Sequence, residues 1–168
     1  MAARVLIVDD EVDSCWLAAF ILRRDPNLAL AGEATDGEMA VSLVRQERPD
    51  VVLMDVMMPR LDGLEAIRRI KREWPDTKVL VLTHLTDDHT RREAFEKGAD
   101  AFLDKRDMAS ALVPAIWDAC GVRRPRSARS LERLPFGLLR ITYGAAEVPA
   151  EERGVLVSWL AKSPRKVR

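Results

Sequence analysis

The strongest constraint on the fold is the alternation, through residues 1–120, of short β-branched apolar runs with longer segments of helical period. Such alternation is typical of a parallel sheet whose strands are connected by helices. Five runs are short and apolar enough to be buried strands. They are residues 4–8, 29–34, 51–54, 78–82 and 101–103. The sequence therefore predicts an α/β fold with a doubly wound, five-stranded parallel sheet.

The segments between these runs carry signals for helix ends. Four aspartates are predicted N-caps: Asp13, Asp36, Asp62 and Asp107. Glu65, three residues after Asp62, completes a pattern typical of a capping box. A further helix over about residues 88–97 is expected to end at Gly98, where a left-handed cap suits glycine. Pro114 lies inside the last helical segment and is expected to kink it.

Composition excludes several classes of protein. The chain has 168 residues, enough for one domain and a remainder, with 48% hydrophobic and 32% charged residues. No run approaches the ~18 apolar residues of a membrane span, and the apolar run at residues 5–8 is too short for a secretory signal. We therefore expect a cytoplasmic protein with no membrane partner. Cys15 and Cys120, far apart and outside any Cys-x-x-Cys pattern, are expected to be buried free thiols.

Charge divides the chain into two parts. Residues 1–120 carry a net charge of −7, and residues 121–168 carry +7. The acidic part suits a hard cation, whereas the basic part suits an acidic partner, nucleic acid or the acidic part itself. We expect a domain over residues 1–120, a basic linker over 121–135 and a short C-terminal extension over 136–168.

The extension has few elements of its own. Residues 138–143 are predicted to form a strand and residues 150–161 a helix. Residues 151–156 faintly resemble the opening helix of a helix-turn-helix domain, but no recognition helix follows. The extension is therefore expected to fall short of a complete effector domain and to pack on another surface.

The first and third predicted strands are each followed directly by carboxylates. Asp9 and Asp10 follow the first strand, and Asp55 follows the third. Ligands of open parallel sheets bind outside the carboxyl ends of the strands, and a doubly wound order with these two strands adjacent would gather the three acids. Their mutual repulsion calls for a cation. Oxygen ligands in a small site favour Mg²⁺, with Mn²⁺ as a substitute.

A hydroxyl and an ammonium group follow the fourth and fifth strands. Thr83 follows the fourth strand, and Lys105 lies just beyond the fifth. A metal, a carboxylate, a hydroxyl and a lysine together suit phosphoryl transfer, which depends on positioning and charge neutralisation. Asp55 would be the nucleophile, and Thr83 and Lys105 would each contact a phosphoryl oxygen. Each residue alone is commonplace, so the prediction rests on their conjunction.

Several motifs match a known family. They are VLIVDDE at residues 5–11, DVVLMDVMMP at 50–59, LDG at 61–63, LT at 82–83, and GADAFL at 98–103 followed by Lys105. With these motifs, residues 3–120 resemble the receiver domain of bacterial two-component response regulators. The resemblance implies a flavodoxin-like sheet of order 2-1-3-4-5. Residues 121–168 lie outside it.

The resemblance also implies a site. Asp55 would accept a phosphoryl group from a sensor histidine kinase. Asp10 and Asp55 would bind Mg²⁺ directly together with the backbone carbonyl of Met57, and Asp9 would assist through water. The same resemblance implies that a hydroxyl and an aromatic ring form a switch, and the matching residues are Thr83 and Phe102.

The switch also has a physical basis. A dianionic phosphoryl group would draw the hydroxyl of Thr83 toward it, and the ring of Phe102 would fill the vacated space. Three residues that flank Thr83 or Lys105 either differ from the family pattern or can affect the site. His84 stands where a small residue is usual, Arg106 stands where many members have proline, and Asp104 competes for the adjacent lysine.

We therefore predict a response regulator whose phosphorylation switches protein contacts, rather than a turnover enzyme. Its expected partners are the kinase, a second copy on phosphorylation and a downstream effector. DNA binding by the basic tail after dimerisation is an alternative. A phosphatase is disfavoured because Met57 stands where a general acid is needed, and a flavodoxin because residues 9–13 lack a phosphate cradle. His84 and His89 are expected at the surface.

Overall fold

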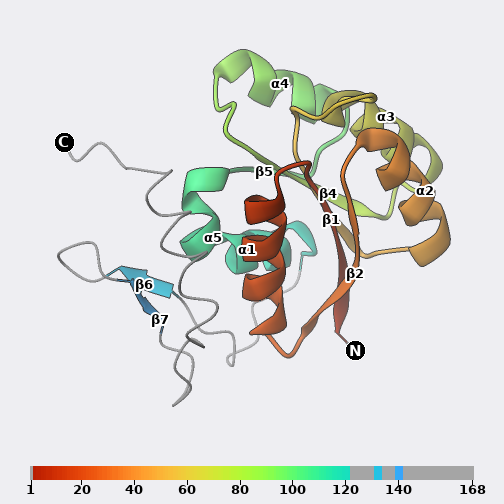
Figure 1. Ribbon diagram of the computed structural model, residues 1–168. Coiled ribbons are helices and arrows are strands. Elements are labelled where there is room, and N and C mark those ends of the chain that lie inside the picture. The colour runs from red at the N-terminus through yellow and green to blue at the C-terminus, as the bar shows by residue number, and fades with distance from the viewer. Residues whose placement is uncertain (1, 122–130, 134–138, 142–168) are drawn as a thin grey trace.

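The computed structural model describes residues 2–121, 131–133 and 139–141, and its centre is a five-stranded parallel sheet (Figure 1). The strand order is β2-β1-β3-β4-β5. The strands are β1 (Ala3–Val8), β2 (Leu28–Ala34), β3 (Val51–Met54), β4 (Lys78–Thr83) and β5 (Ala101–Asp104). The predicted fold class and strand order are confirmed, and each predicted strand matches within one residue at either end.

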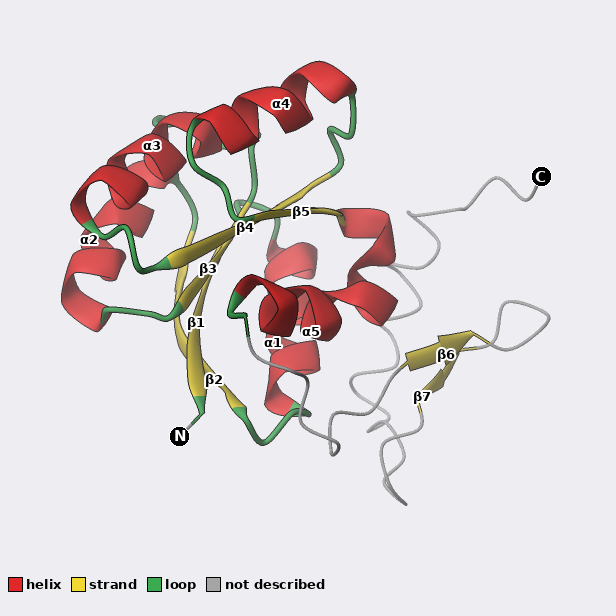
Figure 2. Ribbon diagram, turned by 180° about the vertical axis from the view of Figure 1, so that it is seen from behind, coloured by secondary structure: helices red, strands yellow, loops and turns green. Residues whose placement is uncertain are grey.

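Helices cover both faces of the sheet (Figure 2). One face packs against α1 (Val12–Arg23) and α5 (Met108–Ala119), and the other against α2 (Gly37–Glu47), α3 (Gly63–Glu73) and α4 (Asp88–Glu96). The strands alternate between the two cores: in β1, Val5 and Ile7 face the first, whereas Leu6 and Val8 face the second. Each such side chain, fully buried, contributes about 1.5–3 kcal/mol.

Most predicted helix ends agree with the structure. The Asp36 carboxylate accepts the N–H groups of Glu38 and Met39 at the start of α2, and Asp62 accepts that of Glu65 at the start of α3. Gly98, with φ of +104°, follows α4 in the left-handed conformation. These ends could be predicted because each depends on a local contact between residues two or three apart.

The N-terminal capping of two helices, α1 and α5, differs from the prediction, whereas α4 begins at Asp88 as expected. Glu11, not Asp13, is the N-cap residue of α1, so Asp13 lies in the first helical turn, where its charge favours the helix dipole. The helix begins early because the carbonyl of Glu11 already accepts the N–H of Cys15 at 3.0 Å. Asp87 caps α4. Asp107 precedes α5 without a capping hydrogen bond from its side chain, because the 3₁₀ turn η1 (Lys105–Asp107) leads into that helix.

Two short strands lie beyond the sheet. β6 (Leu131–Arg133) and β7 (Leu139–Ile141) pair antiparallel. β7 lies within the predicted strand at 138–143, whereas β6 lies in a segment predicted as linker without regular structure. The predicted helix at 150–161 lies outside the described residues, and the division of the tail stays a prediction. No helix in the described part of the chain is long and apolar enough to cross a membrane.

Both cysteines are free thiols, as predicted. Cys15 is buried in the core beneath β1, and burial raises the pKa of its thiol to about 12. Cys120 is only half-buried at the end of α5, so the expectation of burial is wrong for this residue.

Candidate functional site

The pairing of β1 with β3 brings two of the predicted acids together. Val8 and Met54 are the last paired residues of these strands, so Asp9 and Asp55 follow them at the same edge of the sheet. The backbone N–H of Asp55 donates to the carbonyl of Val8 at 2.9 Å. Asp9 and Asp55 are 3% and 5% exposed, whereas Asp10 is exposed. Carboxylate oxygens of all three lie within 4.8 Å of one another.

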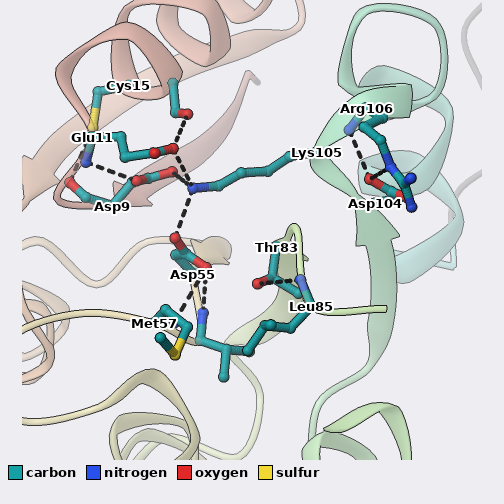
Figure 3. A network of polar contacts seen from close by, with 12 residues as sticks. Asp9, Glu11, Cys15, Asp55, Met57, Thr83, Leu85, Asp104, Lys105 and Arg106 are labelled. Carbon is teal, nitrogen blue, oxygen red and sulfur yellow. Dashed lines mark hydrogen bonds and ion pairs between the residues drawn. The ribbon is translucent and has the colours of Figure 1, made fainter. Parts of the chain in front are cut away.

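Lys105 reaches this cluster from η1, beyond the carboxyl end of β5 (Figure 3). Its Nζ lies 2.6 Å from Oδ2 of Asp55, 2.7 Å from Oδ2 of Asp9 and 3.1 Å from Oε2 of Glu11. The lysine is 1% exposed. One buried ammonium group therefore balances part of the negative charge of three carboxylates.

Burial and charge act against each other on these groups. Burial raises the pKa of Asp9 from 3.8 to about 6, although Lys105 acts in the opposite direction. Burial alone would lower the pKa of Lys105, but Asp9 and Asp55 outweigh it and raise the pKa. Burial would likewise raise the pKa of Glu11, but Lys105 and a hydrogen bond from Ser14 lower it. The lysine is therefore held in its charged form.

The donor set suits a hard cation. Asp9, Asp10 and Asp55 supply only oxygen atoms, and the cluster combines buried carboxylates with one that faces solvent. This combination fits Mg²⁺, which is typically bound through one or two carboxylates and retains several waters.

Backbone groups fix the orientation of the Asp55 side chain. Its Oδ1 accepts the N–H groups of Val56 at 2.6 Å and Met57 at 3.4 Å, while its Oδ2 faces Lys105. The side chain of Met57 points out of the protein and is 65% exposed. The residue predicted to contribute a carbonyl therefore lies directly beside the Asp55 carboxylate (Figure 3).

The two residues of the predicted switch lie on neighbouring strands. Thr83 ends β4, is 1% exposed, and accepts the N–H of Leu85 through its Oγ1 at 3.3 Å. Phe102 is half-buried on β5, where it pairs with Val81 of β4. The guanidinium of Arg91 lies 4.9 Å from the centre of the Phe102 ring. The ring thus lies between the sheet and a cation on α4.

The residues that flank Thr83 and Lys105 either pair with each other or are exposed to solvent. The Asp104 carboxylate pairs with the guanidinium of Arg106. Because Lys105 instead points to Asp9 and Asp55, the structure does not show the expected competition from Asp104. His84 is exposed, and so is His89, as predicted.

Two features of the site escaped the sequence prediction. Glu11 contacts Lys105 and accepts a hydrogen bond from Ser14 at 2.9 Å. Its position directly after two aspartates is a signal that could have indicated this contact. The pairing of Arg60 with Asp36, 24 residues apart, had no such signal.

Comparison with known proteins decides the family. The family model described as the response regulator receiver domain matches residues 5–116, a span that contains all the site residues. The chain belongs to this family. Receiver domains bind Mg²⁺ in an acidic pocket and interact with histidine kinases and effector proteins, and the aspartate cluster of this receiver matches such a pocket.

Curated proteins with different functions contain regions similar to this chain. The transcriptional regulatory protein LiaR of Bacillus subtilis is 42% identical over 114 residues, which cover 67% of this chain and 54% of LiaR. A protein-glutamate methylesterase/protein-glutamine glutaminase of Pyrococcus abyssi is 33% identical over 171 residues, which cover 95% of this chain and 45% of that protein. The chain thus spans about half the length of these curated relatives.

Solved structures agree with the family assignment. The response regulator domain of Thermotoga maritima CheB aligns with a TM-score of 0.69 and 32% identity, covering 74% of this chain and all of that domain. The signal receiver domain of the putative response regulator NarL from Mycobacterium tuberculosis gives the same TM-score at 28% identity and covers 73% of this chain. The tail beyond residue 116 has no family match.

Proposed function

We propose that Asp55 accepts a phosphoryl group from a phosphohistidine of a sensor kinase. The observation that carries this proposal is the pairing of Lys105 with the Asp55 carboxylate inside an acidic, oxygen-lined cluster. A carboxylate oxygen of Asp55 would attack phosphorus as the nitrogen–phosphorus bond breaks and the leaving ring nitrogen takes up a proton from solvent, which leaves an acyl phosphate and a neutral histidine. Such a transfer requires positioned charge more than covalent machinery.

Mg²⁺ would be held by Asp10, Asp55 and the Met57 carbonyl, with Asp9 acting through water. The ion would neutralise charge on the phosphoryl oxygens. Lys105, already 2.6 Å from Asp55, would pair with a second phosphoryl oxygen. The Thr83 hydroxyl would donate a hydrogen bond to a third oxygen.

Phosphorylation would change the surface of the receiver. Turning the Thr83 hydroxyl toward the phosphoryl group breaks its contact with the N–H of Leu85 and opens space beside β4. The Phe102 ring would move into this space and leave the Arg91 guanidinium. The altered surface of α4, β5 and α5 would then bind a second copy of the chain or an effector protein in the cytoplasm.

In this proposal the receiver is a switch rather than a turnover enzyme. The exposed thioether of Met57 lies two residues after Asp55, where a phosphatase would need a general acid. DNA binding is a second candidate, favoured by the transcriptional relatives and by the net charge of +7 on residues 121–168. Duplex binding that strengthens on phosphorylation and weakens steeply with salt would support it.

The phosphoacceptor proposal is tested with acetyl phosphate and Mg²⁺. Intact-mass measurement of the wild type should show the gain of one phosphoryl group, labile to alkali as an acyl phosphate is. Asp55→Asn should show none, whereas Asp62→Asn, which preserves the helix cap, should behave as wild type. A wild type that gains no mass, or an Asp55→Asn protein that gains the same mass, would overturn the proposal.

A further inference from the structure

The loop between β3 and α3, residues 55–62, is tied to the start of α2 by two contacts. The N–H of Gly37 donates to the carbonyl of Leu61 at 3.1 Å. The guanidinium of Arg60 pairs with Oδ2 of Asp36. These contacts join the loop that follows Asp55 to α2, which packs beside α3 on the same face of the sheet (Figure 2).

Asp36 is a fixed anchor for this ion pair. Its side chain is 5% exposed, and its Oδ1 accepts the N–H groups of both Glu38 and Met39 at 2.9 Å. The hydrogen bond from Met39, followed by the contact with Arg60, lowers the pKa of Asp36 and keeps the carboxylate ionised. The carboxylate thus uses one oxygen to cap α2 and the other to hold the loop.

Arg60 adopts an uncommon backbone conformation to make this contact. Its φ is +65°, in the left-handed region that residues other than glycine, asparagine and aspartate rarely adopt. A strained conformation persists only where surrounding contacts hold it in place. The guanidinium is 65% exposed, so burial contributes little to that restraint, and the ion pair with Asp36 is a side-chain contact that can hold Arg60 in this conformation.

The other end of the loop lies in the phosphorylation site. The N–H groups of Val56 and Met57 contact Oδ1 of Asp55, and the N–H of Gly63 donates to the carbonyl of Val56 at 3.0 Å. Met57, whose carbonyl is a proposed Mg²⁺ ligand, lies three residues before Arg60. The loop is held on both sides of Met57. The Met57 carbonyl therefore loses less conformational entropy when the ion binds.

We propose that the Arg60–Asp36 ion pair positions the β3–α3 loop for Mg²⁺ binding, and thereby sets the ion affinity of the receiver. This role rests on the proposed function of Asp55. Arg60 touches neither the ion nor the phosphoryl group, so it is a positioning residue. Loss of either partner leaves the Gly37–Leu61 hydrogen bond to hold the loop to α2, so the loop is less restrained and Mg²⁺ must order it further.

The test is calorimetric titration of Mg²⁺ into variants chosen to spare the fold. Arg60→Asn removes the guanidinium but tolerates the left-handed backbone, and Asp36→Asn removes the charge but retains an N-cap. Each should raise the dissociation constant for Mg²⁺ about 10-fold. This is the low end of the loss in affinity expected when a residue that supports the metal ligands is removed. The double variant should bind no more weakly than either single variant, because the two residues act as one contact.

Two controls separate positioning from general damage. Arg60→Lys keeps the charge and should restore binding to within about threefold of wild type, although lysine lacks the fork of arginine. Arg45→Gln removes a different exposed ion pair, which joins Arg45 in the last turn of α2 to Glu73 at the end of α3, and should bind Mg²⁺ as wild type does. Thermal unfolding of each variant in chelator reports any loss of stability independently of the ion.

The outcomes are distinct. A wild type that takes up no Mg²⁺ would remove the proposed function and this inference together. A wild type that binds Mg²⁺, with Arg60→Asn and Asp36→Asn variants of unchanged affinity, would overturn the positioning role alone. Additive losses in the double variant would also overturn it, because they would show that the two residues act separately.

Discussion

The Nζ of Lys105 lies 2.6 Å from Oδ2 of Asp55, although 50 residues separate them in the chain. Both groups are buried, so their attraction is weakly screened by solvent. The same ammonium group also contacts Asp9 and Glu11. Lys105 thus offsets part of the negative charge of this acidic cluster.

Lys105→Met tests that role. The substitution keeps much of the chain length but removes the charge, which leaves the carboxylates of Asp9 and Asp55 buried together without a compensating cation. We expect a loss of about 2–4 kcal/mol in the free energy of unfolding at pH 7 in chelator, measured by urea denaturation. Added Mg²⁺ should recover part of this loss.

The matched control for this prediction is Lys97→Met. Lys97 forms an ion pair with Glu93 at the surface, 3.8 Å apart, and its loss should change the stability by less than about 0.5 kcal/mol. If Lys105→Met proved as stable as wild type in chelator, the ammonium would not be balancing the cluster.

Asp9 makes the free energy of unfolding of the metal-free protein depend on pH. Its pKa is raised from 3.8 to about 6 by burial, so between these values the folded state binds more protons than the unfolded state. The contribution of Asp9 to stability is therefore present at low pH and is lost as the pH rises from about 4 through 6. The total change is on the order of 2–3 kcal/mol.

Asp9→Asn should remove this dependence. In chelator, the stability of the variant relative to wild type should rise as the pH increases from about 4 through 6, by roughly 2–3 kcal/mol in total, and then level off. Urea denaturation of both proteins between pH 4.5 and 7.5 measures the difference. A stability difference that does not change with pH would contradict the raised pKa.

Gly63 is predicted to be intolerant of any side chain. A Cβ atom there would lie 1.8 Å from the carbonyl oxygen of Asp55, which is backbone and cannot move aside. Gly63→Ala should therefore cost about 3 kcal/mol or more in thermal or urea unfolding. Gly32→Ala is the control, because its Cβ would meet Leu6 at an ordinary 3.5 Å. Equal effects of the two substitutions would contradict the close approach.

Thr83 is predicted to act through its hydroxyl. Thr83→Ala removes a donor to the phosphoryl group and should slow phosphorylation by acetyl phosphate about 10-fold, as expected for one charge-assisted hydrogen bond. Thr83→Ser keeps the hydroxyl and should react at nearly the wild-type rate. The rates are followed by intact mass over time. A slow Thr83→Ser protein would instead indicate that the methyl group and packing matter.

Much of the fold was predictable because its signals are local. The five strands coincide with short runs rich in apolar residues, and Asp36, Asp62 and Gly98 mark helix ends through contacts with near neighbours. The strand order was taken from the resemblance to a known family, because no local signal sets it. β6 escaped prediction because three residues in an arginine-rich segment carry no periodicity.

The site was predictable as a set of residues but not as a set of contacts. The position of Asp9, Asp55, Thr83 and Lys105 after successive strands indicated a common edge of the sheet. The contact of Glu11 with Lys105 and that of Arg91 with Phe102 depend on side-chain directions, which residue spacing does not specify. The burial that raises the pKa of Asp9 likewise arises only when the surrounding elements pack together.

The most direct test of the account is to locate the phosphoryl group in the chain. After incubation with acetyl phosphate and Mg²⁺, borohydride reduction converts a phosphorylated aspartate to homoserine, and peptide mass spectrometry identifies the position. The account predicts conversion at Asp55 and at no other aspartate, with no conversion in chelator. Conversion at a different residue, or conversion that is independent of Mg²⁺, would contradict it.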